Sequence, residues 1–324
     1  MKDRKLRVPG EISLLVAAMI WGAAFVAQSL GADKVSPFTF NASRSLIGAL
    51  FIAGMFLVND KIHISRGEKV ETGGKALYIG GAVCGLLLFF AMNLQQLGIS
   101  LTEPAVVSGA ETEAMEKANV GKAGFLTALY IVLVSLIGVF MKKKPGLFVW
   151  LGVLTALIGL YLLCIKPGFS VSKSDFYVIL CAFAFSLQII AVDIFAPKVD
   201  CLRLSCLQFL VCGVISSFVA VILEKPDMRD ILSAWAPILF TGILSSGVAY
   251  TLQIIGQKTC LRPSIASLIM SLESVFSALF GFIILGQSLT SREFAGCAIM
   301  FAAVILAQIH PSKERKAYKR YEKA

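Results

Sequence analysis

The sequence has little charge and lacks the residue patterns on which many soluble enzymes depend. Asp, Glu, Lys and Arg make up 15% of its 324 residues, whereas they make up about a quarter of a typical soluble domain. The sequence contains no Walker A, GxGxxG or HExxH motif, no clustered metal ligands and no nucleophile triad. We therefore expect no cofactor, no metal site, no enzyme activity, and no ATP-driven pumping by this chain alone.

The eight cysteines also lack a recognisable pairing pattern. Six fall within apolar runs, Cys201 and Cys260 fall between such runs, and no CxxC is present. We interpret them as small, mostly buried apolar residues rather than as a zinc site or a disulfide framework.

Long apolar runs are what the sequence has in abundance. Residues of the hydrophobic types make up 57% of the chain and the mean hydropathy is +0.81. A run of about 20 apolar residues is long enough to cross a bilayer as a helix, and these runs show no period of two that would indicate an outer-membrane barrel. We predict an all-α integral membrane protein with ten transmembrane helices, at 12–31, 38–58, 76–99, 123–140, 147–165, 176–195, 202–223, 235–256, 263–285 and 293–309.

The distribution of Lys and Arg predicts the orientation in the membrane. With a cytoplasmic N-terminus, the inside segments hold more than twice as many Lys and Arg as the outside segments. This asymmetry places both termini in the cytoplasm of a multi-pass protein of the inner or plasma membrane. The basic tail at 311–324 is expected to lie near anionic lipid. We therefore interpret the net charge of +10 as a topology signal and expect no nucleic-acid partner.

The two halves of the chain resemble each other. "KVSPFTF" (34–40) aligns with "KVDCLRL" (198–204), and "NLQQLG" (93–98) aligns with "TLQIIG" (251–256). Further along, Tyr130 aligns with Glu273, and Gly152 aligns with Gly296. We predict two related five-helix units, the first at 1–146 with its fifth helix at 147–165, and the second at 174–310.

The repeat predicts a mechanism. A unit with five helices ends on the side opposite to where it began, so the second unit enters the membrane upside down. Such an inverted pair can exchange two mirror-related conformations, which provides alternating access. The segment 103–117 has no counterpart in the second unit, and we predict that it is an external loop insertion. We expect a tolerated surface insertion, with a lid or partner site as the alternative.

The chain resembles EamA-type members of the drug/metabolite transporter superfamily. The resemblance rests on "IWGAAF" (20–25), "KAGFLTALYIVLV" (122–134), "SLIMSLESVFSALFGFIILGQSLT" (267–290) and "GCAIMFAAVILAQ" (296–308). It implies a carrier of small metabolites, such as amino acids, amines or drugs, with a central cavity between helices one to four and six to nine. Ser135 and Ser274 stand where relatives often carry Pro, and Gln287 stands where they often carry Glu.

Glu273 is the most informative polar residue in the predicted spans. It lies ten residues after Pro263, which is roughly 15 Å along a helix and close to the bilayer midplane. A carboxylate facing lipid there is costly, so we expect it to face the protein interior or a wet cavity. It is either a site that couples transport to protons, a counter-charge for an amine substrate, or a structural acid hydrogen-bonded between helices.

Six further residues are candidates for substrate binding or coupling. Arg44 either holds a substrate carboxylate or phosphate, pairs with Glu273, or extends toward the external interface. Amides in facing helices either line a polar cavity or join helices by hydrogen bonds. The remaining candidates are Gln95, Gln253, Asn93, Tyr250 and Trp21.

The sequence therefore predicts a secondary active transporter, a permease or exporter that moves small metabolites or drugs across the cytoplasmic membrane. An integral-membrane enzyme that modifies lipid and a passive small-solute channel are the alternatives. The expected partners are the substrate and the bilayer. Whether a second copy of the chain is also a partner stays open.

Overall fold

The computed structural model describes residues 10–67, 73–101, 123–141, 145–165, 172–259, 262–285 and 289–309. The predicted insertion at 103–117, the basic tail at 311–324, Cys260 and Gln287 lie outside this part of the chain. Within it all regular structure is helical: α1 (Gly10–Ala32), α2 (Pro37–Ser65), α3 (Gly74–Ser100), α5 (Tyr130–Phe140), α6 (Leu147–Cys164), α7 (Lys173–Phe195), η1 (Ala196–Lys198), α8 (Cys201–Leu223), α9 (Met228–Ser233), α10 (Trp235–Leu239), η2 (Phe240–Ala249), α11 (Tyr250–Thr259), α12 (Pro263–Met270), α13 (Glu273–Leu285) and α14 (Ser291–Ala307).

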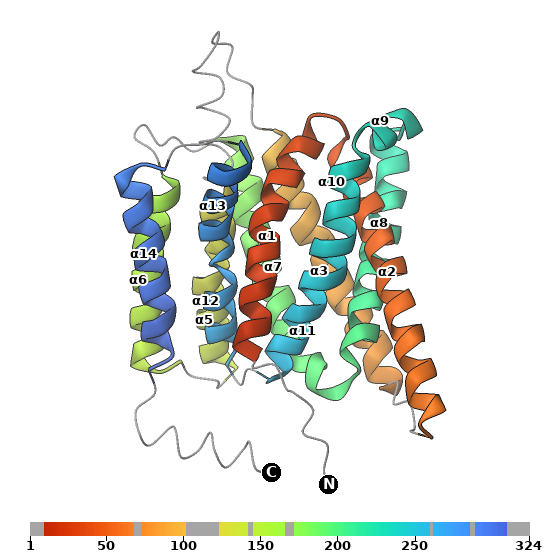
Figure 1. The fold of residues 1–324 in the computed structure, drawn as a ribbon, viewed down its shortest axis with the longest axis horizontal. Helices are drawn as coiled ribbons and strands as arrows, with labels where there is room; N and C mark the ends of the chain where they lie inside the picture. Colours follow the sequence, from red (N-terminus) through yellow and green to blue (C-terminus); the bar gives the residue numbers. More distant parts are fainter. Residues whose placement is uncertain are drawn as a thin grey trace.

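Nine helical segments in the described residues are long and apolar enough to cross a membrane. They include Ala123–Phe140, which contains α5, Trp235–Thr259, which contains α10, η2 and α11, and Pro263–Ile284, which contains α12 and most of α13. The tenth predicted span corresponds to α14, which has 17 residues and runs beside α6 (Figure 1). The fold is therefore a multi-pass helical bundle, and the count of ten spans stays a prediction.

Three of these segments are not regular α-helices from end to end. In Trp235–Thr259, ten residues from Phe240 to Ala249 form a π-helix. Ala123–Phe140 has a turn at Leu129, and Pro263–Ile284 has a turn at Ser271 and Leu272. The turn at Leu129 comes directly before Tyr130, and the turn at Ser271 and Leu272 comes directly before Glu273. The sequence aligns Tyr130 with Glu273. The two units are therefore interrupted at equivalent positions.

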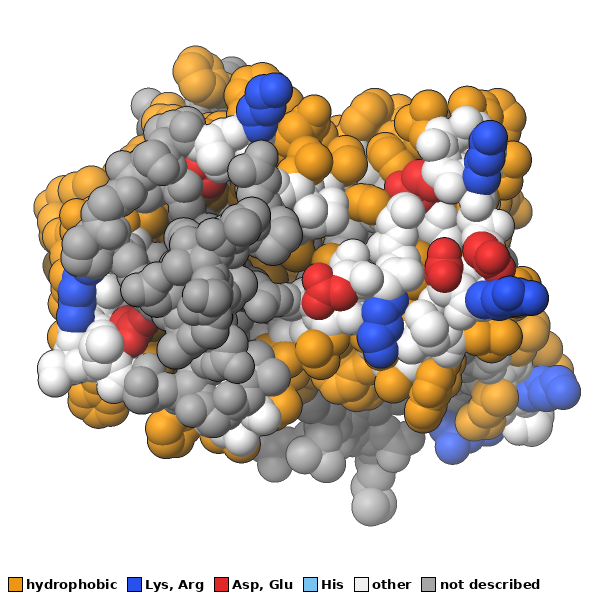
Figure 2. Space-filling view, turned by 90° about the horizontal axis from the view of Figure 1, so that it is seen from above, with side chains coloured by type: hydrophobic (Ala, Val, Ile, Leu, Met, Phe, Trp, Pro, Cys, Tyr) orange, Lys and Arg blue, Asp and Glu red, His pale blue; other side chains and the backbone are white. Residues whose placement is uncertain are grey.

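Apolar residues surround the bundle, and charges collect at its ends. Seen along the helices, the rim is largely hydrophobic, whereas Lys, Arg, Asp and Glu side chains lie on the end face (Figure 2). Phe140, Phe218 and Val221 are among the exposed apolar side chains. The start of α1 and the end of α14 lie at the same end of the bundle (Figure 1). This distribution suits a protein that presents apolar side chains to lipid.

Glycines allow the helices to approach closely. A Cβ on Gly85 of α3 would lie 2.7 Å from the Val211 Cβ and 2.8 Å from the Gln208 carbonyl oxygen, both on α8. A Cβ on Gly81 would lie 2.6 Å from the Leu207 Cβ. The spacing of Gly81 and Gly85, four residues apart on one face of α3, therefore gives a close contact with α8.

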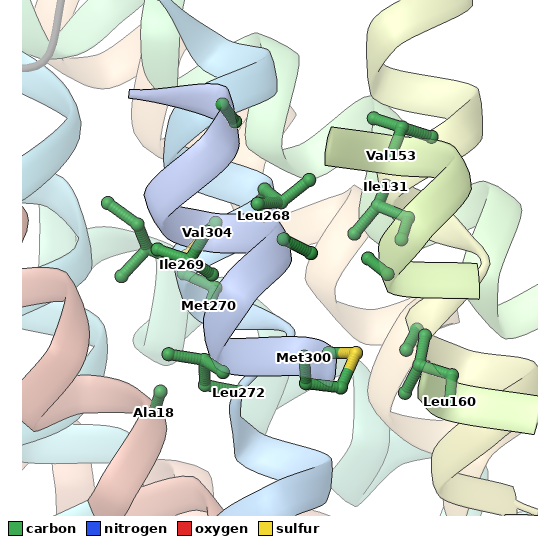
Figure 3. Packing of buried hydrophobic residues seen from close by; sticks show 14 of the residues in the cluster. Ala18, Ile131, Val153, Leu160, Leu268, Ile269, Met270, Leu272, Met300 and Val304 are labelled. Atoms are coloured by element: carbon green, nitrogen blue, oxygen red, sulfur yellow. The ribbon is translucent and has the colours of Figure 1, made fainter. Parts of the chain in front are cut away.

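The largest buried apolar cluster joins both units around the break in the ninth span. Leu268, Ile269, Met270 and Leu272 pack between neighbouring helices (Figure 3). Their partners come from α1, α5, α6 and α14 and include Ala18, Ile131, Val153, Leu160, Met300 and Val304. This packing holds the turn before Glu273 in a fixed place.

Helices α2 and α8 are joined near both ends by carboxylates. At the start of α2, Glu224 accepts hydrogen bonds from the Phe38 and Thr39 backbone N–H groups, at 2.9 and 2.7 Å, and from the Thr39 hydroxyl at 2.7 Å. Near the other end, Asp60 forms an ion pair with Arg203. When the alignment of 34–40 with 198–204 is extended, Asp60 corresponds to Glu224, and Thr39 corresponds to Arg203. Equivalent contacts near opposite ends of α2 and α8 therefore join the two units.

Candidate functional site

A polar cavity lies between the two units. Its lining residues enclose about 500 Å³ of space that no atom fills, open solvent included. It lies where α1, α2 and α3 of the first unit face α7, η2 and α11 of the second, and the broken fourth and ninth spans close it. Its lining residues are Trp21, Phe25, Gln28, Arg44, Gln95, Thr127, Tyr130, Phe185, Gln188, Ile189, Ser245, Tyr250, Gln253, Met270 and Glu273.

Six of the seven residues singled out in the sequence line this cavity, and Asn93 does not. Asn93 is buried, accepts a hydrogen bond from the Asn41 amide at 3.1 Å, and donates to the Ser216 hydroxyl at 2.9 Å. It therefore joins α3 to α2 and α8 by hydrogen bonds. In the second unit, Thr251 donates to Ser205 at 3.0 Å, and these residues align with Asn93 and Asn41.

Glu273 is the first residue of α13 and is held by its equivalent in the other unit. Only 7% of Glu273 is exposed. The Tyr130 hydroxyl donates to its Oε1 at 3.3 Å. Because Tyr130 and Glu273 each follow an equivalent helix break, the two units meet at this hydrogen bond. The acid faces the cavity, as its expected midplane position requires.

Arg44 is equally buried but lacks a carboxylate partner among the described residues. It is 3% exposed and lies on α2 opposite η2, where Ser245 also faces the cavity. Its guanidinium carbon lies 5.7 Å from the centre of the Phe40 ring, and its Nε has no hydrogen-bond partner. Of the sequence alternatives, an ion pair with Glu273 and an extended position at the interface are both absent from this conformation of the described residues.

Aromatic rings also line the cavity. The Tyr250 ring packs edge-to-face against Trp21 at 4.8 Å and against Phe209 at 5.0 Å, measured between ring centres. Tyr250 directly follows the π-helix, a feature that often accompanies functional sites because it reorients side chains. The Trp21 Nε1 has no hydrogen-bond partner and lines the cavity.

Amide side chains of the cavity form two equivalent groups, one in each unit. In the second unit, Gln253 donates to Gln188 at 3.2 Å, and Gln188 donates to Gln208 at 3.2 Å. In the first unit, Gln95 instead donates to Thr127 at 3.4 Å, and the Gln28 Oε1 has no partner. The amide pair is therefore joined in the second unit and separate in the first.

Sequence reasoning missed Gln28, Gln188, Phe25 and Phe185, although a signal for them is present. Placing Phe25 on Phe185 also places Gln28 on Gln188 and Asp33 on Asp193. This alignment of α1 with α7 identifies two equivalent pairs, and all four of these Phe and Gln residues line the cavity. Among the described residues, no three His, Cys, Asp or Glu side chains are grouped to hold a metal.

Comparison with known proteins agrees with this architecture. The model of the EamA-like transporter family matches the chain twice, at residues 8–165 and 172–308. An "Uncharacterized transporter" from Archaeoglobus fulgidus is 26% identical over 94% of this chain and 87% of its own length. The "Uncharacterized transporter YoaV" from Bacillus subtilis is 21% identical over 91% of this chain and 95% of its own.

A solved crystal structure has the same fold. It superposes with a TM-score of 0.71 at 19% identity and covers 94% of this chain and 99% of that one. The two family matches together extend over nearly all of the described residues. The chain belongs to the EamA-like transporter family of the drug/metabolite transporter superfamily and is a multi-pass membrane transporter.

Proposed function

We propose that this protein is a secondary carrier that moves a small polar solute across the cytoplasmic membrane by alternating access. The observation that carries the proposal is that equivalent residues of both units line one cavity, namely the pairs Phe25/Phe185, Gln28/Gln188, Gln95/Gln253 and Tyr130/Glu273. In this proposal α14 is the tenth span, the two five-helix units are inverted, and both termini are cytoplasmic.

The unequal amide pairs suggest how the opening of the cavity moves from one side of the membrane to the other. Gln188 and Gln253 are hydrogen-bonded, whereas their equivalents Gln28 and Gln95 are not. We infer that this structure is one of two mirror-related conformers. In the other conformer, Gln28 and Gln95 are joined and Gln188 and Gln253 are separate. The cavity then opens to one side of the membrane at a time.

Disulfide crosslinks in reconstituted liposomes test this mechanism. One variant carries cysteines at Gln188 and Gln253, a second carries them at Gln28 and Gln95, and a third carries all four, each with the eight native cysteines replaced. Each pair should crosslink, each crosslink should stop exchange of labelled metabolites in a counterflow assay, and reduction should restore it. In the four-cysteine variant, formation of one crosslink should exclude the other. Both crosslinks in one molecule, or flux without counterflow as in a passive channel, would contradict the proposal.

A further inference from the structure

Two glycines, one in each unit, occupy equivalent places against α2 and α8. A Cβ on Gly85 of α3 would lie 2.8 Å from the Gln208 carbonyl oxygen of α8, and a Cβ on Gly242 of η2 would lie 3.1 Å from the Arg44 carbonyl oxygen of α2. The alignment of 34–40 with 198–204, when extended, pairs Arg44 with Gln208. The same alignment pairs the other close neighbours of the two glycines, Ile47 and Val211. Gly85 and Gly242 are therefore equivalent.

The stretch that follows each glycine ends at an equivalent glutamine but differs in length. Gln95 and Gln253 are paired in the sequence alignment, and both line the cavity. Gln95 comes ten residues after Gly85, whereas Gln253 comes eleven residues after Gly242. The second unit therefore has one additional residue between two equivalent points. The sequence alone does not show this residue, because the equivalence of the glycines follows from their contacts.

The π-helix accommodates the additional residue. An α-helical turn closes its hydrogen bond over four residues, whereas a π-helical turn closes it over five. In the first unit α3 is α-helical from Gly74 to Ser100, and in the second unit Phe240–Ala249 form the π-helix. One additional residue in an α-helix would rotate Gln253 by about 100°. The wider turns of η2 therefore allow Gln253 to face the cavity as Gln95 does.

The wider turns also change which side chains reach the cavity. Ser245 lines the cavity, and its carbonyl oxygen accepts a hydrogen bond from the Tyr250 N–H, which lies five residues further along the chain. Counted from the two glycines, the equivalent of Ser245 is Leu88. Leu88 is fully buried among apolar side chains and is not part of the cavity wall. The second unit therefore presents a hydroxyl to the cavity at a position where the first unit has a core leucine.

We propose that the additional residue in η2 is a positioning element of the cavity. It widens the helix, which turns Ser245 from the apolar core toward the cavity and keeps Gln253 facing the cavity. Ser245 is then a cavity residue that the first unit lacks. This inference goes beyond the proposed function, because it concerns how the cavity wall is built and does not depend on the mechanism of transport.

Shortening η2 by one residue tests the inference. Deletion of Ser246 and, separately, deletion of Val248 should each convert η2 to an α-helix, because α3 shows that the equivalent stretch packs without the additional residue. Both shortened variants should elute as a single folded species in detergent, with an unfolding midpoint near that of the parent. Deletion of Phe90 is the matched control in α3. The Phe90 side chain is 48% exposed, but α3 contains no additional residue, so this deletion should abolish the folded species.

Thiol reactivity separates the positioning of Ser245 from folding. Ser245→Cys and Gln253→Cys are made with the eight native cysteines replaced, and modification by methyl methanethiosulfonate is followed by mass spectrometry. Both introduced cysteines should react in the chain of full length. In the shortened variants Ser245→Cys should react roughly tenfold more slowly or less, because it takes the buried place equivalent to Leu88. Gln253→Cys should react as before.

Three results would overturn the inference. Loss of the folded species in both shortened variants, or equal tolerance of the Phe90 deletion, would show that η2 contains no additional residue. A folded shortened variant in which Ser245→Cys keeps its full reactivity would show that the additional residue does not position Ser245. An unreactive Ser245→Cys in the chain of full length would contradict the place of Ser245 in the cavity wall.

Discussion

The contact between α6 and α14 gives the sharpest test of how the two units are held together. A Cβ on Gly296 of α14 would lie 2.7 Å from the Leu163 nitrogen and 2.8 Å from the Gly159 carbonyl oxygen, both on α6. Both neighbours are backbone atoms, so no flexible side chain can move aside. We therefore expect Gly296→Ala to force α6 and α14 apart.

The size of the effect follows from the distances. Ordinary van der Waals contact begins at 3.4 Å, so the added methyl must move away from the 2.7 Å position by several tenths of an ångström. A gap of about 0.5–1 Å across a packed contact loses a quarter to a half of its dispersion attraction, and overpacking typically costs about 1–3 kcal/mol. Replacing Gly by Ala returns up to about 1 kcal/mol of helix propensity. The net loss in the free energy of unfolding should be about 1–2 kcal/mol.

Gly54→Ala is the matched control, because a Cβ on Gly54 of α2 meets no atom within 4 Å. The midpoint of thermal unfolding in detergent should fall for Gly296→Ala and stay the same or rise for Gly54→Ala. No residue of α6 or α14 lines the cavity, so ligand affinity should be unchanged in both variants. Equal midpoints for the two variants would refute the close contact, and a selective loss of affinity in Gly296→Ala would refute the separation of this contact from the cavity.

Three further predictions concern the cavity, the ends of α2 and α8, and the topology. Tyr130→Phe should lower the free energy of unfolding by about 1 kcal/mol, because the buried Glu273 loses its hydrogen-bond donor; an unchanged midpoint of thermal unfolding would contradict this. Glu224→Gln should lower the free energy of unfolding by about 1–2 kcal/mol, because the carboxylate that caps α2 loses its charge; an unaltered unfolding midpoint would count against it. An impermeant thiol reagent should spare Cys201 in intact cells and label a cysteine placed at Ser108 in a Cys-free background, and the reverse pattern would overturn the proposed orientation.

The spans were predictable because apolar length is a direct consequence of bilayer thickness. The predicted helix at 147–165 differs from α6 by one residue at its end. The interruptions inside spans were not predictable in the same way. The turns at Leu129 and at Ser271 and Leu272 contain neither Gly nor Pro, and the π-helix η2 has no simple sequence signature. Packing from neighbouring helices fixes these features.

The candidate site was predictable where a polar residue stood out in an apolar run. Glu273 and Arg44 were found in this way, and both line the cavity. Asn93 has the same signature but hydrogen-bonds neighbouring helices, because a buried amide can serve either purpose. Sequence reasoning alone does not separate these uses. The alignment of α1 with α7 adds Gln28 and Gln188 to the residues that line the cavity.

The equivalence of the two units is also relevant to the position of Glu273. Tyr130 and Glu273 occupy equivalent positions and are hydrogen-bonded to each other, so they lie where the two units meet. In the proposed exchange, a residue at this position keeps its surroundings while the units swap conformations. Arg44 differs, because its equivalent is the neutral Gln208, which is hydrogen-bonded to Gln188 and does not line the cavity. Glu273 therefore lies at the meeting point of the two units, whereas Arg44 is a feature of the first unit alone. This difference makes the cavity asymmetric although its scaffold is repeated.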